Sequence, residues 1–284
     1  MMSKIIIPLI IAMVVCNACM QREKDGSIEG YDLSKPVEMK MDAGLNEISG
    51  IAFNNGNPDT IYAIQDEEGR LFYFAANNVD LRDIKFGKKG DYEDLAICNG
   101  KVIVLRSDGT FFTFSLNLAG EEIDSVQEFK DLLPKGEYEG IYADEKSNEL
   151  FVLCKNCSDD NAKQLTGYVL QLSDAGSLSI KNNFTIDTRQ IVAQENEKKI
   201  SFRPSALAKN IITNEWFILS SVNKLLVIMD EQWKLKEALP LDPALFPQPE
   251  GIAFDRDNNL YISNERVSIE SATVLKFIKT GKTN

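Results

Sequence analysis

Three glutamates occupy the same position in a short phrase that recurs along the chain. The phrase is a six-residue motif at 47–52, 91–96, 137–142, 203–208 and 248–253, and Glu93, Glu139 and Glu250 are each its third residue. If the fold brings them together, their carboxylates will repel one another and their pKa values will rise. A bound calcium ion would relieve this repulsion, because calcium takes about six to eight oxygen ligands from carboxylates, amides, carbonyls and water. We therefore interpret the three glutamates as the first candidates for a calcium site.

The spacing of the phrase predicts how the chain would bring these residues together. The phrase occurs five times, and the steps between its fourth residues are 44, 46, 66 and 45 residues; these fourth residues are Gly50, Asp94, Gly140, Ala206 and Gly251. A period of about 40–45 residues with several short strands is typical of a β-propeller blade. Each phrase would form the innermost strand of a blade. Alternate residues of a strand point the same way, so its first and third residues should face the central channel.

Three further strands are expected after each phrase. The second strand is strongly apolar in each repeat, as expected for a strand buried on both faces; it spans 60–65, 101–106, 149–154, 215–220 and 259–264. Outer strands with alternating polarity follow four of the phrases, at 80–86, 122–129, 178–186 and 234–239. The last repeat ends too early for an outer strand. Residues 36–41 alternate in the same way, so we expect them to complete the last blade and close the ring.

The sequence thus predicts an all-β fold, a propeller of five blades with four antiparallel strands each. A six-bladed propeller is the alternative, and only the 66-residue step has room for another blade. Within that step, residues 157–166 and 187–200 lack the apolar pattern of a second strand. We interpret them as insertions, the second being a loop or a short helix.

Further residues are expected near the same mouth of the channel. The first residue of the first phrase and the ends of the second strands add possible oxygen ligands: Glu47, Asp66, Asn264 and Glu265. Other side chains expected to line the channel are Ser49, Arg106, Arg203 and Ser205. The acids could instead pair with Arg106 and Arg203, and this alternative stays open.

Composition excludes several classes of function. The 284-residue chain contains no histidine, so it has no histidine triad, histidine general base or histidine zinc ligand. Its formal net charge of −12 argues against a nucleic-acid partner, because phosphate backbones require a basic surface. Oxygen ligands without histidine also favour calcium over zinc or copper.

The N-terminus resembles a bacterial lipoprotein signal. Lys4 precedes an apolar run from Ile5 to Val15, which is too short to span a bilayer, and Ala18 precedes Cys19. We expect a signal peptide over residues 1–19 with lipidation of Cys19; an ordinary secretion signal is the alternative. A polar tether over residues 20–31 and a propeller domain over 32–284 would follow. The protein would then be a monomer anchored in the cell envelope, preferably to the outer membrane, with the plasma membrane as the alternative.

A pair of cysteines lies in Cys154-Lys155-Asn156-Cys157. Redox-active pairs with this spacing normally open a helix, which lowers the thiol pKa. Here the pair follows the apolar strand 150–154, so we expect either a structural disulfide or two unreactive thiols.

The five phrases, together with residues 255–264, resemble the SdiA-regulated family over about residues 31–280. The resemblance implies an envelope-associated five-bladed propeller, distantly related to NHL repeats, with a calcium site and no established activity. The chain departs from the family pattern at Asp94, where glycine is common, and at Lys155, where an acidic residue is often found at the end of the strand.

Two functions are compatible with these features. The first is a lipid-tethered module that holds calcium and presents its loops to a small-molecule or protein ligand. The second is a calcium-dependent hydrolase that acts on lactones or phosphate esters, since metal catalysis needs no histidine. The first is preferred, because the second depends mainly on an analogy of fold.

Overall fold

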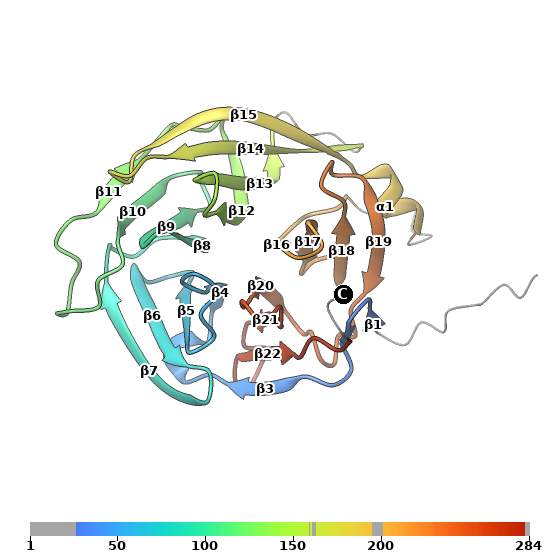
Figure 1. Ribbon diagram of the computed structural model, residues 1–284, viewed down its shortest axis with the longest axis horizontal. Helices are drawn as coiled ribbons and strands as arrows, with labels where there is room; N and C mark the ends of the chain where they lie inside the picture. The colour runs from blue at the N-terminus through green and yellow to red at the C-terminus, as the bar shows by residue number, and fades with distance from the viewer. Residues whose placement is uncertain (1–26, 159, 161–162, 195–200, 282–284) are drawn as a thin grey trace, which may run out of the picture.

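The computed structural model describes residues 27–158, 160, 163–194 and 201–281. Five four-stranded antiparallel sheets form a ring (Figure 1), and residues of all five innermost strands line a central channel. Blade 1 contains β4 (Ile48–Ala52), β5 (Thr60–Gln65), β6 (Arg70–Ala75) and β7 (Asn78–Lys85). Blade 2 contains β8 (Tyr92–Cys98), β9 (Lys101–Arg106), β10 (Phe111–Ser115) and β11 (Gln127–Phe129). Blade 3 contains β12 (Gly136–Asp144), β13 (Glu149–Cys157), β14 (Gln164–Leu172) and β15 (Leu178–Asp187).

The last two blades follow the insertion. Blade 4 contains β16 (Ala206–Asn210), β17 (Glu215–Ser220), β18 (Leu225–Met229) and β19 (Leu235–Pro240). Blade 5 contains β20 (Pro249–Phe254), β21 (Leu260–Asn264), β22 (Thr273–Phe277) and, as its outer strand, β3 (Val37–Lys40). The 66-residue step holds the short helix α1 (Arg189–Gln194) and no extra blade among the described residues. Five blades and closure by an N-terminal strand are therefore confirmed.

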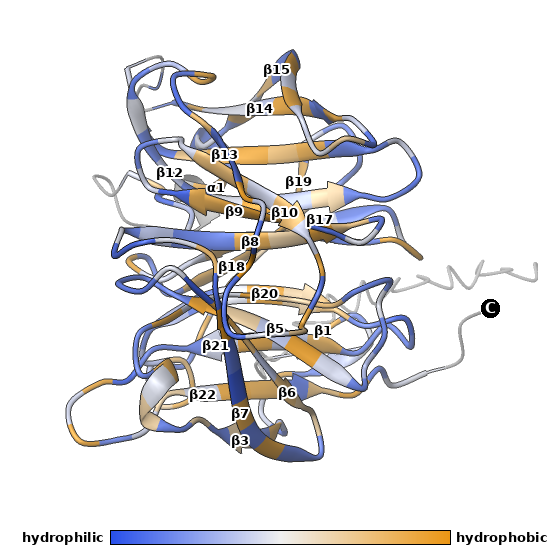
Figure 2. Cartoon of the chain, turned by 90° about the vertical axis from the view of Figure 1, so that its left-hand side faces the viewer, coloured by the Kyte–Doolittle hydropathy of each residue, from blue (hydrophilic) through white to orange (hydrophobic). Residues whose placement is uncertain are grey.

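The ring is held together by contacts between neighbouring blades. Each inner strand contacts the inner strands on both sides of it, in the order β4, β8, β12, β16, β20 and back to β4. Apolar residues concentrate along the strands and polar residues in many of the loops (Figure 2). The buried clusters accordingly contain residues from adjacent blades, as expected when apolar strand faces pack sheet against sheet.

The fourth residue of the phrase explains how closely the inner strands approach. A Cβ atom added at Gly251 would lie 3.0 Å from the carbonyl oxygen of Ser49 on the neighbouring inner strand. In blade 2 this position is Asp94, which is buried and accepts hydrogen bonds of 2.8 Å from the backbone N–H groups of Leu95 and Ile141. Asp94 therefore links the inner strands of blades 2 and 3, a structural role for this departure from the family pattern.

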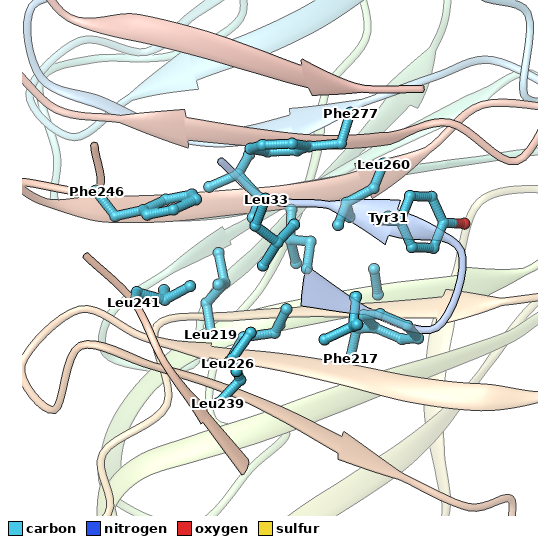
Figure 3. Packing of buried hydrophobic residues seen from close by; sticks show 14 of the residues in the cluster. Tyr31, Leu33, Phe217, Leu219, Leu226, Leu239, Leu241, Phe246, Leu260 and Phe277 are labelled. Carbon is cyan, nitrogen blue, oxygen red and sulfur yellow. The ribbon is translucent and has the colours of Figure 1, made fainter. Parts of the chain in front are cut away.

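The N-terminal segment packs on blades 4 and 5 (Figure 3). A small hairpin of β1 (Ser27–Ile28) and β2 (Tyr31–Asp32) precedes the ring strand β3, and a short 3-10 helix (Ala43–Leu45) follows it. Tyr31 is buried, and its hydroxyl donates a hydrogen bond of 2.7 Å to the carbonyl oxygen of Asn258. This corrects the predicted tether, because residues 27–31 belong to the folded domain: Ile28 and Tyr31 bury apolar surface that a solvated tether would expose.

The predicted signal peptide, with Cys19, lies outside the described residues. None of the helices that the structure describes has the length and apolar character needed to cross a membrane.

Candidate metal and ligand site at the channel mouth

Bulges in the inner strands aim the third residue of the phrase. In blades 1, 2, 3 and 5 the pairing of inner and second strands skips this position, leaving Ser49, Glu93, Glu139 and Glu250 as the extra residues. A bulge bends the strand and redirects the side chain of its unpaired residue. Bulges are invisible in a pattern of alternating residues, so the sequence predicted the convergence of these positions but not the local geometry behind it.

The most concentrated acidic group is a triad of Glu47, Asp66 and Glu265. These residues come from the starts and ends of strands in blades 1 and 5, and each offers a carboxylate oxygen within 4.8 Å of the other two. All three side chains are half-buried. Backbone hydrogen bonds from Asp66 to Glu47 (3.2 Å) and from Glu265 to Gln248 (2.9 Å) hold the strand ends that carry the triad.

The electrostatics of the triad favour a bound cation. Burial, followed by the negative charges of Glu250, Glu47 and Asp66, raises the pKa of Glu265 to about 8. Burial, with Glu47 as the largest charge, also raises the pKa of Asp66. A cation among these oxygens would restore their ionised forms.

The residues of the triad fit a calcium ion. Oxygens that share one calcium ion lie at most about 5 Å apart, twice a typical calcium–oxygen distance, which agrees with the spacing of the three carboxylates. Oδ1 of Asp66 is buried and accepts no hydrogen bond from the described residues. An orphaned carboxylate oxygen of this kind is costly unless a ligand or ion satisfies it. Three carboxylates form a hard donor set suited to calcium or magnesium.

The three glutamates first predicted as ligands surround a lysine of the chain. Lys155 is the extra residue of a bulge in β13 and forms an ion pair with Glu139. Its charge also acts on Glu93 and Glu250, lowering pKa values that burial raises; the pKa of Glu93 still reaches about 8. An ammonium group therefore lies among Glu93, Glu139 and Glu250. The departure of Lys155 from the family pattern was the sequence signal for this arrangement.

Two of the predicted residues make side-chain contacts with neighbouring strands and turns, although Oδ1 of Asn264 is buried and accepts no hydrogen bond from the described residues. The side-chain nitrogen of Asn264 donates to the carbonyl of Leu245 (3.3 Å) and to Thr273 (3.1 Å) on the next strand of its blade. Arg106 binds Asp108 and lies over the ring of Phe112 in the core between blades 1 and 2. Asn264 pairs with Pro249, and Arg106 pairs with Tyr92. Pro249 and Tyr92 are each the second residue of a phrase. Neighbouring residues of a strand point to opposite faces, so Asn264 and Glu265 face different sides of the sheet.

The predicted serines support the mouth through hydrogen bonds. Ser49 donates to the carbonyl of Glu47 (3.3 Å), and Ser205 donates to the carbonyl of Pro249 (3.0 Å). Ser205 also accepts a hydrogen bond of 3.2 Å from the backbone N–H of Ser221. Arg203 lines a pocket at this mouth together with Lys155 and Lys224. Lys224 was not predicted from the sequence, because it precedes β18 in a turn that belongs to no phrase and no strand pattern.

Cys154 and Cys157 form a disulfide, one of the two outcomes left open by the sequence. The strand β13 continues through Cys157 instead of ending at Cys154, and no helix begins at the pair. Asp160 lies near both sulfur atoms, but its carboxylate accepts hydrogen bonds from the backbone N–H groups of Cys157 (3.1 Å) and Thr166 (2.7 Å). The group therefore has a structural explanation and needs no metal.

Comparisons with solved structures agree with the fold. The glutaminyl cyclase of Myxococcus xanthus has a TM-score of 0.56 at 12% identity, with 85% of this chain and 93% of that chain covered. A luciferin-regenerating enzyme has a TM-score of 0.53 at 11% identity, with 87% and 96% covered. The calcium-binding protein regucalcin from Agrobacterium tumefaciens has a TM-score of 0.51 at 11% identity, with 86% and 94% covered. At these identities the similarity shows the fold alone.

No curated protein matches the sequence. The sequence profile of the SdiA-regulated family, in contrast, matches residues 28–267, a range that begins at the N-terminal hairpin and includes all five inner strands. The five phrases that suggested this family form those inner strands, together with the residues leading into them. This protein belongs to the SdiA-regulated family.

Proposed function

We propose that this protein is a calcium-binding propeller, anchored in the cell envelope through Cys19, that serves as a binding module for a small-molecule or protein ligand. The observation that carries the calcium site is the acidic triad of Glu47, Asp66 and Glu265, with its orphaned buried oxygen. Regucalcin, described as a calcium-binding protein, shares the fold, which is compatible with this proposal.

The position of the triad suggests what the ion would do. Its residues belong to blades 1 and 5, whose inner strands β4 and β20 are neighbours in the ring. Glu47 precedes β4, and Glu265 follows the second strand of blade 5. A calcium ion would neutralise carboxylates at the junction where the first phrase meets the last blade. We therefore expect it to stabilise the closed ring and to place a positive charge beside the ligand-accessible mouth.

The test is thermal unfolding of the full chain, purified in detergent, with EDTA and then with excess calcium or magnesium. At 100 times its dissociation constant, a ligand stabilises the native state by about 2.7 kcal/mol, a rise in Tm of several degrees. We expect a calcium-specific rise that Glu265→Gln removes. The matched control is Glu270→Gln, which removes one charge from an exposed residue of the same blade and should leave the rise intact. Equal responses of the two variants would contradict the proposed site.

A calcium-dependent hydrolase is the second candidate. The observation in its favour is Glu93, whose carboxyl has a pKa near 8 and lies close enough to Asp66, Asp91 and Lys155 for their charges to affect it. A carboxyl with a pKa near neutrality is suited to accept and return a proton. Hydrolysis of a lactone or phosphate ester that requires calcium and is lost in Glu93→Gln, with calcium binding retained, would favour this function over the binding module.

Anchoring is tested separately. Cys19→Ala should release the protein from the membrane fraction, and mass spectrometry of the wild-type N-terminus should find a lipidated cysteine. An N-terminus without lipid would instead indicate an ordinary secretion signal.

A further inference from the structure

Basic side chains gather on one side of the channel mouth, although the chain as a whole is strongly acidic. A cavity of about 370 Å³ is lined by Lys155, Arg203 and Lys224, together with Glu139 and Glu250. This volume lies within the range typical of small-ligand pockets. Arg203 and Lys224 flank strands of blade 4, whereas the acidic triad belongs to blades 1 and 5. The mouth therefore has an acidic side and a basic side.

Arg203 is held so that its guanidinium is available. Its backbone N–H donates a hydrogen bond of 3.0 Å to the side chain of Asn223, and its carbonyl accepts one of 2.5 Å from Ser220. These bonds fix the backbone to the turn between β17 and β18. The side chain is exposed and forms no ion pair with a described carboxylate. An unpaired guanidinium on an anchored backbone presents a planar set of donors that matches the two oxygens of a carboxylate or phosphate.

Lys224 adds a second positive charge that no described residue neutralises through an ion pair. It lies in the same turn, with a left-handed backbone (φ 51°), and its Nζ donates to the carbonyl of Pro247. Burial lowers the pKa of Lys224, and the charge of Glu250 opposes this only partly. An anion in the cavity would stabilise the charged amine.

The acidic residues of the cavity do not cancel its positive charge. Glu139 is neutralised by its ion pair with Lys155. Glu250 lies near the hydroxyls of Ser221 and Ser205 and near the charges of Lys155 and Lys224, while burial raises its pKa. With Lys155 and Glu139 offsetting each other, Arg203 and Lys224 outweigh Glu250 even when Glu250 is ionised.

We propose that Arg203 and Lys224 form a binding subsite for an oxyanion, a carboxylate or phosphate group carried by a small ligand that enters the channel mouth. The subsite goes beyond the calcium-binding function proposed above and does not require the ion. A ligand anchored there would extend toward Lys155 and the acidic side, where a positively charged group or a bound calcium ion would complement it.

The experiment is isothermal titration of the full chain in detergent, stripped of metal with EDTA and then dialysed free of it, with inorganic phosphate and, separately, with acetate. We expect saturable binding of at least one anion, weakened about 10-fold or more by Arg203→Gln or Lys224→Gln, because each removes charge-assisted hydrogen bonds. Lys234→Gln, at an exposed position of the same blade, is the matched control and should bind as the wild type does. Arg203→Lys should retain part of the affinity.

Each outcome decides the proposal. Phosphate binding alone indicates a phosphorylated ligand, acetate binding alone indicates a carboxylate ligand, and either supports the subsite if Arg203→Gln weakens it. Unchanged thermal unfolding of the variants would show that the fold persists. Absence of saturable binding, or equal weakening by Lys234→Gln, would overturn the proposal. Because the protein is free of calcium throughout, failure here would leave the calcium site untouched, and failure of the calcium site would leave this result standing.

Discussion

Calcium binding at the acidic triad should release a proton and weaken steeply below pH 8. Glu265 has a pKa of about 8 in the metal-free protein, so only about 1% of it is ionised at pH 6. Calcium requires the ionised carboxylate, so the affinity at pH 6 should be about 100-fold weaker than well above pH 8. Between these limits the change is about 10-fold per pH unit. Burial and the charge of Glu47 raise the pKa of Asp66 as well, so its ionisation on calcium binding would also release protons.

Isothermal titration in buffers of different ionisation enthalpy measures both the affinity and the number of protons released. We expect close to one proton per calcium ion near pH 7. Glu270→Gln should reproduce this value. A calcium affinity that stays constant between pH 6 and pH 8, with no proton release, would refute the assignment of Glu265 as a ligand.

The stability of the metal-free protein should depend on pH with a defined sign. The pKa of Glu265 is raised from 4.5 to about 8, so between these values the native state binds more protons than the unfolded state. The free energy of unfolding should therefore fall as the pH rises through this window. Glu93 titrates over the same window, so Glu265→Gln should reduce the slope without abolishing it. Saturating calcium should reduce this fall in the free energy of unfolding, because the ion favours the ionised carboxylates.

Three further predictions concern the fold. Cys154→Ser should lower the free energy of unfolding by about 2 kcal/mol, from the entropy of a four-residue loop, and a dithiol should destabilise the wild type similarly in urea titrations; an unchanged midpoint would contradict a stabilising disulfide. Asp94→Ala should cost about 2 kcal/mol in the same assay, because the buried N–H of Ile141 loses its acceptor, and no loss would mean that the link between blades 2 and 3 is dispensable. Tyr31→Ala should cost about 3–5 kcal/mol by leaving a cavity beneath the N-terminal hairpin, whereas Tyr31→Phe should cost only about 1 kcal/mol; equal losses would assign the effect to the hydroxyl.

The sequence by itself determined the architecture. The phrases ending at Ala52, Ala96 and Ala253 repeat at the period of a blade, and the apolar strands between them require neighbouring sheets for burial. The alternating residues 36–41 also predicted the strand that closes the ring, because the last repeat was one strand short. Periodicity and apolar pattern are properties of the sequence itself. The order of the strands in the sheets confirms the predictions made from them.

The composition of the site depended on the tertiary structure. Strand alternation placed Glu93, Glu139 and Glu250 at the mouth, but a bulge in β13 adds Lys155 to the same place. Bulges in the inner strands likewise leave Glu93 and Glu250 unpaired, next to the regular pairs that Arg106 and Asn264 make with Tyr92 and Pro249. The sequence named Glu47, Asp66 and Glu265 as possible ligands, yet only the closed ring brings carboxylate oxygens from its two ends within 4.8 Å of one another. A sequence pattern predicts to which face of its strand a side chain points. Which charged groups lie close together depends on bulges and on how separate blades pack, and the sequence pattern contains neither.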